Sequence, residues 1–96
     1  MADLNELIHQ PVRLRIMSAL VALEEGAQVD FTYLKKLLGL TDGNLGTHLL
    51  KLEEAGYLTQ DKAFVDRKPR TYIRITAPGR EAFAKHVAAL KEILGG

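Results

Sequence analysis

The sequence contains no cysteine and no apolar run that approaches the length of a membrane span. Without cysteine there are no disulfides, no thiolate catalysis, no thiol redox sensing and no cysteine-ligated zinc. A transmembrane helix needs about 18 or more apolar residues in a row, so we expect no membrane partner. A signal peptide begins with basic residues and an apolar stretch, whereas Asp3 and Glu6 stand at this amino terminus. We therefore expect a cytoplasmic protein.

The motifs of common enzymes and metal sensors are also missing. The sequence has no phosphate-binding glycine loop, no nucleophile elbow and no His-Glu-x-x-His motif. Its acidic pairs, 24–25 and 53–54, are neighbours near helix ends, and adjacent helical residues do not converge on one substrate. His9, His48 and His86 are isolated, and none has another histidine three or four residues away. The sequence predicts no enzyme, no metal site and no cofactor, and we interpret His86 as an interface or surface side chain.

The composition is that of a small globular domain. The chain has 96 residues, of which 47% are apolar and 26% are charged, so we expect one domain over residues 1–96. Hydrophobic periodicity, with its start and stop signals, predicts mainly helices and one β-hairpin. The expected elements are helical turns after Asp3, helices over 11–23, 32–38, 42–55 and 77–94, an extended segment at 28–31, and strands over 57–65 and 71–75.

Several residues predict where these elements begin and end. Side-chain oxygens that can cap a following helix occur at Asp30 or Thr32, at Thr41 and at Thr76. Glycines that suit the left-handed position after a helix follow at Gly39 and Gly56. Residues 66–70, which include Pro69, are expected to form the polar connection of the hairpin, where a missing backbone donor does no harm.

This order of elements predicts a winged helix-turn-helix, a mainly α fold with a small β-hairpin wing. Residues 32–56 form the helix-turn-helix and residues 57–76 the wing. In such a unit the second helix lies in the major groove of DNA and presents its N-terminal residues to base edges. The leucines of that helix face the core, and its outward residues are Asp42, Gly43, Asn44, Thr47, His48 and Lys51. An asparagine amide can pair with adenine, and lysine can bind guanine or phosphate.

The charge distribution supports an anionic partner. The net charge is only +1, but residues 62–80 carry six basic residues and one acid. Any amphipathic helix has a polar outer face, so the helix alone does not establish DNA binding. Arg67, Lys68 and Arg70, with Thr71 after them, add a wing suited to phosphate oxygens or to a minor groove. The two features together predict double-stranded DNA as the partner.

The sequence resembles the small prokaryotic winged-helix transcriptional regulators related to the MarR and ArsR families. The resemblance runs from about Pro11 to the end and rests on residues 40–58, on Arg67-Lys-Pro-Arg-Thr-Tyr72 and on Thr76-Ala-Pro-Gly-Arg80. It implies a homodimer that contacts DNA through Thr41 and the helix at 42–51 and through the wing at 67–71. Gly46 departs from the pattern, because such helices often carry serine there.

Two other functions remain open from the sequence. A winged helix can serve as a protein-binding adaptor, but adaptors need no basic wing. RNA is less favoured because we identify no aromatic platform for stacking bases, with Tyr72 as our one candidate near the wing.

The apolar surface exceeds what one winged-helix core needs, which predicts a homodimer. The residues expected at its interface come from 1–23 and 77–96 and are Leu4, Leu7, Ile8, Leu14, Met17, Val21, Phe83, Val87, Leu90 and Leu94. Such a dimer would read a near-palindromic operator with half-sites about 34 Å apart. The alternative is that the last helix folds over the first within one chain. The sequence names no small-molecule effector.

Overall fold

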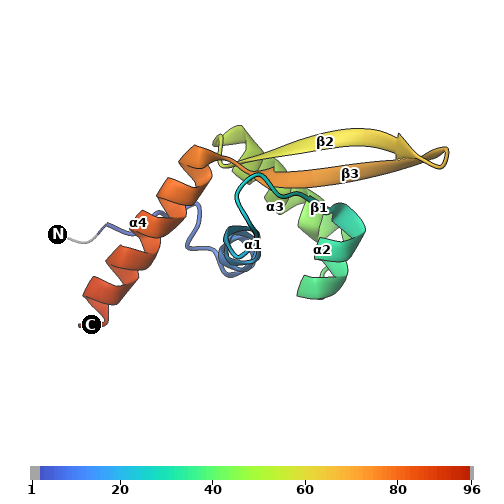
Figure 1. Cartoon of the computed structure of the whole chain (residues 1–96). Coiled ribbons are helices and arrows are strands. Elements are labelled where there is room, and N and C mark those ends of the chain that lie inside the picture. The colour runs from blue at the N-terminus through green and yellow to red at the C-terminus, as the bar shows by residue number, and fades with distance from the viewer. Residues whose placement is uncertain (1–2, 96) are drawn as a thin grey trace.

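The computed structural model describes residues 3–95, which form four α-helices and a three-stranded antiparallel sheet. The elements in chain order are α1 (Pro11–Val21), β1 (Val29–Asp30), α2 (Phe31–Leu38), α3 (Asp42–Glu54), β2 (Leu58–Val65), β3 (Lys68–Ile75) and α4 (Ala77–Ile93). The predicted fold class is therefore confirmed. The β2–β3 hairpin extends to one side of the molecule and α4 to the other (Figure 1). Within the described residues, no helix is both long enough and apolar enough to cross a membrane.

The predicted helix caps are present. Each cap is a side-chain oxygen that accepts a hydrogen bond from a backbone N–H in the first helical turn, which would otherwise lack a partner. The bonds are Tyr33 N–H to Asp30 at 2.7 Å, Asn44 N–H to Thr41 at 3.1 Å and Gly79 N–H to Thr76 at 3.0 Å. Asp30, rather than Thr32, caps α2. Gly39 and Gly56, with φ of 67° and 83°, take the predicted left-handed conformation after α2 and α3.

Helix α1 is shorter than predicted, because it ends at Val21 rather than near residue 23. The guanidinium of Arg80, on α4, donates hydrogen bonds to the carbonyl oxygens of Val21 at 3.2 Å and of Leu23 at 3.0 Å. These carbonyls have no partner within the helix, so a side chain distant in sequence caps its C-terminus. The contact also fixes the start of α4 against the end of α1.

The hairpin turn differs from the prediction. Asp66 and Arg67 alone form the turn, with φ of 51° and 65°, which are the two positive values that a type I′ turn requires. Strand β3 starts at Lys68, and Pro69 lies within it opposite Phe64. In this register Val65 and Lys68 form the hydrogen-bonded pair next to the turn. The next pair, Phe64 and Pro69, is therefore a non-hydrogen-bonded pair, and β2 needs no backbone N–H donor from Pro69.

The hydrophobic core lies between the helices and the buried half of the sheet. Strand β3 is central, with β1 and β2 on either side of it. The predicted inner face of α3 is confirmed, since Leu45, Leu49 and Leu52 have no exposed surface. Other completely or almost completely buried side chains in this core are Ile8, Ile16, Met17, Leu20, Leu34, Leu58 and Ile73. The strand pairs nearer the turn extend beyond this core, and residues 61–70 are exposed.

His86 is buried, which corrects its interpretation as an interface or surface side chain. Only 1% of His86 is exposed, and its Nδ1 accepts a hydrogen bond from the Asn5 N–H at 3.1 Å. Its Nε2 lies 3.4 Å from Nδ1 of His9. Burial lowers the pKa of His86, and the nearby charge of His9 lowers it further. His86 therefore holds the segment before α1 against α4 as a neutral side chain.

Candidate nucleic-acid interface

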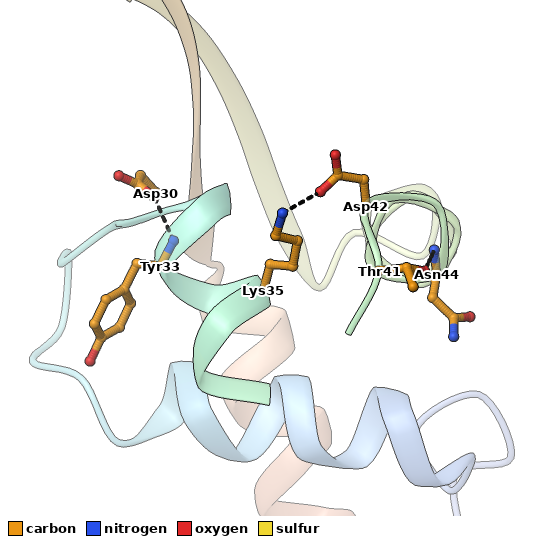
Figure 2. Close-up of polar contacts among 6 residues, drawn as sticks. All are labelled: Asp30, Tyr33, Lys35, Thr41, Asp42 and Asn44. Atoms are coloured by element: carbon orange, nitrogen blue, oxygen red, sulfur yellow. Dashed lines mark hydrogen bonds and ion pairs between the residues drawn. The ribbon is translucent and has the colours of Figure 1, made fainter. Parts of the chain in front are cut away.

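Helices α2 and α3 form a helix-turn-helix whose turn is fixed by backbone hydrogen bonds. The N–H of Leu40 donates to the carbonyl of Lys35 at 3.1 Å, and the N–H of Gly39 to that of Lys36 at 3.3 Å. This pair of bonds is the Schellman motif, which requires the left-handed glycine. Lys35 Nζ then forms an ion pair with Asp42 at 2.8 Å and joins the two helices directly (Figure 2).

The outer face of α3 is polar and exposed, as predicted. Asp42, Gly43, Asn44, Thr47 and Lys51 are exposed, and His48 is half-buried. The Asn44 amide points away from α2 in Figure 2, and within residues 3–95 it makes no side-chain hydrogen bond. The pairing of Asp42 with Lys35 offsets the one negative charge on this face, which would otherwise repel phosphates.

Neither glycine of α3 is required by packing within the chain. Apart from its chain neighbours and the backbone of its own helix, a Cβ added to Gly43 or Gly46 would meet no atom of the described residues within 4 Å. Each glycine nevertheless makes the helix less favourable by about 1 kcal/mol relative to alanine. A glycine in a helix often permits close approach of another helix, but among the described residues no such neighbour lies beside Gly43 or Gly46.

The basic residues near the tip of the wing, Arg67, Lys68 and Arg70, fall into two groups. Arg67 and Lys68 are exposed at the turn, and neither pairs with a carboxylate within the described residues. Arg70 is different, because its guanidinium forms an ion pair with Asp30 at 2.9 Å. Between the wing and α2 lies an open groove of about 560 Å³ whose lining includes Lys36 and Lys68. Free cations thus lie at the wing tip and along this groove, and Lys62 on β2 is also exposed without a carboxylate partner among the described residues.

Comparisons with known proteins agree with this geometry. A family model described as a winged helix DNA-binding domain matches residues 12–94. The chain belongs to this family. An uncharacterized protein of Methanocaldococcus jannaschii is 38% identical over 88 residues, which covers 92% of each chain. The structure of a transcriptional regulator homologue from Pyrococcus horikoshii OT3 matches with a TM-score of 0.85 and 35% identity, over 96% of this chain and 88% of that one.

A more distant structure shows the fold alone. It is described as a possible transcriptional regulator from Methanosarcina mazei Go1, and it matches with a TM-score of 0.66 at 22% identity, over 93% of this chain and 76% of that one. The family model and the Pyrococcus structure confirm the resemblance to winged-helix regulators. The family model is described by its fold and by DNA binding, so the narrower MarR and ArsR label is not retained.

Within this winged helix, the ten residues expected at a dimer interface fall into three sets. Ile8 and Met17 have no exposed surface, so they belong to the monomer core and their assignment to an interface is wrong. Four half-buried residues pack partly on their own core, namely Leu7, Leu14, Val21 and Phe83. Four others lie outside that core cluster, namely Leu4, Val87, Leu90 and Leu94. The predicted alternative to a dimer, in which α4 folds over α1 within one chain, therefore covers only part of this apolar surface.

One residue that lies beside the outer face of α3 was not predicted from the sequence. Arg13, in the first turn of α1, places its Nη1 3.2 Å from Nδ1 of His48 on α3. Burial lowers the pKa of His48, and the charges of Arg13 and Lys51 lower it further. No local pattern signals this contact, because 35 residues separate the two side chains. The charge of Arg13 adds to that of Lys51 on one side of α3.

Proposed function

We propose that this winged-helix protein is a transcriptional regulator that binds double-stranded DNA sequence-specifically as a homodimer. In this proposal α3 enters the major groove, and the wing at 65–71 contacts the backbone or the minor groove. The observation that carries the proposal is the exposed polar face of α3, which lies in the same small domain as a wing tip with free cations. The description of the Pyrococcus relative as a transcriptional regulator homologue supports the regulatory role.

Base reading is assigned to the first two turns of α3. Asn44 has an exposed amide that can donate to and accept from the N6 and N7 atoms of adenine. Thr47, one turn further, can contact a phosphate or the methyl group of thymine. Lys51 can reach a phosphate or guanine. Arg67 and Lys68 supply sequence-independent attraction to the backbone.

The homodimer is proposed from the outer side of α4. Leu94 is 81% exposed and Ile93 is 55% exposed, while Val87 and Leu90 lie outside the core cluster. The C-terminal end of α4 extends away from the sheet (Figure 1). Apolar side chains along one helix that are exposed or only half-buried, and lie outside the core cluster, favour packing against a second copy about a two-fold axis. That symmetry would place two α3 helices about 34 Å, or a multiple of it, apart and would require a near-palindromic operator.

DNA binding is tested by its dependence on salt. A dimer with Lys51, Arg67 and Lys68 on phosphates would neutralise six charges, so log K against log salt concentration should fall with a slope of roughly −5. Fluorescence anisotropy on a labelled duplex gives this slope. A protein-binding adaptor, the alternative function, would show no duplex binding and an apolar contact with little dependence on salt.

The dimer is tested by sedimentation at micromolar concentration. The parent protein should sediment at twice its mass of 10.6 kDa, and a Leu90→Asp, Leu94→Asp double variant should be a folded monomer that binds DNA much more weakly. Leu37→Asp, at a leucine that is 56% exposed on α2, is the matched control and should remain dimeric. A parent that sediments as a monomer would contradict the dimer.

A further inference from the structure

The guanidinium of Arg13 is held in place between two elements. Its Nε donates a hydrogen bond to the carbonyl oxygen of Leu7 at 2.5 Å, in the segment before α1. Its Nη1 lies 3.2 Å from Nδ1 of His48, on the second turn of α3. The side chain is therefore anchored at one end and reaches the DNA-facing helix with the other.

The chemistry of the pair determines the protonation state of the histidine. A guanidinium has only N–H donors and does not lose its proton in proteins. For a hydrogen bond to form, Nδ1 of His48 must accept and so carries no proton. A neutral imidazole has one proton, which is then on Nε2. Burial and the charges of Arg13 and Lys51 lower the pKa of His48, which agrees with a neutral ring.

We propose that Arg13 is a positioning residue that makes His48 an Nε2–H hydrogen-bond donor toward an acceptor atom of DNA. The inference rests on the proposed function and adds a specificity-determining pair to it. The acceptor is a base-edge nitrogen or oxygen in the major groove, or a phosphate oxygen beside it. A histidine with its proton on Nδ1 would present an acceptor instead and would be repelled by the same atoms.

The position of His48 on the helix supports this role. His48 lies one helical turn after Asn44 and three residues before Lys51, so its side chain is near both reading residues. Neither Arg13 nor Lys51 pairs with a carboxylate within the described residues. No anion of the protein therefore neutralises these two cations in place of DNA. A purely structural brace between α1 and α3 would fix the same tautomer, but the affinity for DNA would then not depend on the Nε2 proton.

The tautomer is tested first, in the protein without DNA. Nitrogen-15 NMR of the histidine rings at pH 7.5 should show the His48 proton on Nε2 in the parent protein. In Arg13→Met the Nδ1 hydrogen bond is absent, and the two tautomers should be mixed. Arg15→Met is the matched control, because Arg15 lies on the same helix and bonds instead to the Leu38 carbonyl at 2.8 Å. A parent ring protonated on Nδ1 would overturn the proposal, whatever the outcome with DNA.

The role in binding is tested with a double-mutant cycle. The probes are a 30-base-pair duplex enriched from a random-sequence pool by the parent protein, and the unselected pool. Arg13→Met should weaken binding of the enriched duplex roughly tenfold, and Arg15→Met should weaken it less than about twofold. His48→Gln places an amide N–H donor near the position of Nε2 and needs no tautomer. In that background Arg13→Met should cost less than about twofold.

The outcomes separate the inference from the proposed function. If Arg13→Met costs the same in both backgrounds, Arg13 contacts DNA by itself and the positioning role is wrong. If no duplex is bound while the NMR shows the expected tautomers, the proposed function fails and the proposal fails with it. Replacing purines of the enriched duplex with 7-deaza analogues tests base N7 as the acceptor. Methylphosphonate linkages test the phosphate. Loss of the His48 contribution with either one identifies the acceptor.

Discussion

The guanidinium of Arg70 and the carboxylate of Asp30 form an ion pair at 2.9 Å that joins the wing to the start of α2. Asp30 uses its other carboxylate oxygen to cap that helix through the N–H of Tyr33. One aspartate therefore connects the wing and the helix-turn-helix, although Arg70 follows it by 40 residues in the chain. The wing cations therefore divide into Arg70, which orients the hairpin, and the tip residues Arg67 and Lys68, which remain free to bind phosphate.

This division predicts different salt dependences for two arginine variants. Arg67→Ala should weaken binding to every duplex and reduce the salt slope by about one per protomer, because a phosphate contact is lost. Arg70→Ala should change the slope by less than that, since the half-exposed pair contributes at most about 1 kcal/mol and acts on orientation. Anisotropy titrations between about 50 and 200 mM salt measure both. Equal slopes for the two variants would contradict the division.

The turn offers a control for the charge at Arg67. Arg67 has a φ of 65°, a conformation that glycine adopts without the cost of about 1–2 kcal/mol that other residues bear. Arg67→Gly should therefore raise the free energy of unfolding relative to Arg67→Ala, while both lose the same DNA affinity. Urea denaturation and anisotropy report the two quantities. Restored binding in the glycine variant would show that turn geometry, rather than charge, sets affinity.

Asn44 is predicted to read one base pair. Asn44→Ala should lose about 1–3 kcal/mol on the preferred duplex and reduce discrimination at a single position. Thr59→Ala, an exposed position on β2, is a control that should bind as the parent does. Competition with duplexes altered at each position locates the effect. A variant that loses affinity equally for all duplexes would make Asn44 a backbone contact.

The two glycines of α3 are predicted to be costly for stability and useful for binding. Because a Cβ at Gly43 or Gly46 meets nothing within 4 Å, alanine at either position should stabilise the free protein by about 1 kcal/mol. If DNA backbone approaches α3 at these positions, the same variants should bind the duplex more weakly. Denaturation and anisotropy on each variant separate the two effects. Unchanged binding in both variants would leave the glycines without a role in the interface.

Acid should destabilise the protein through its histidines. The pKa values of His86 and His48 are lowered in the folded state, so the unfolded chain takes up protons more readily below the ordinary value of about 6.5. The stabilisation is complete above that pH and is lost as the pH falls toward the folded pKa values. His86→Asn keeps an acceptor for the Asn5 N–H without titrating, and should lose less free energy of unfolding between pH 7.5 and 5. An equal loss in parent and variant would contradict the role of His86.

Much of the fold could be predicted because its determinants are local. The capping oxygens, the glycines after α2 and α3, and the leucines of α3 lie within a turn of the structure that they specify. The polar face of α3 follows from the same periodicity, since leucines that face inward leave Asn44, Thr47 and Lys51 outside. The candidate reading surface was therefore accessible from sequence.

The remaining features depend on contacts between distant residues or on strained backbone. The turn at Asp66 and Arg67 could not be predicted, because Arg67 stands at the second position, where glycine normally supplies the positive φ, although aspartate is common at the first. The pairing of Arg70 and the placement of Arg13 beside His48 arise only when the elements pack. Ile8 was assigned to an interface because the apolar surface exceeded what one winged-helix core needs, and no local pattern shows that the segment before α1 packs on that core.

We propose that this winged helix reads duplex DNA as a symmetric pair. The decisive experiment is selection of bound fragments from genomic DNA by the parent protein, followed by sequencing. We predict an enriched near-palindromic sequence whose half-sites are separated by about 10 base pairs or a multiple of that, as two α3 helices on one face of DNA require. Recovery of fragments with no enriched sequence, or of a single asymmetric site, would contradict it.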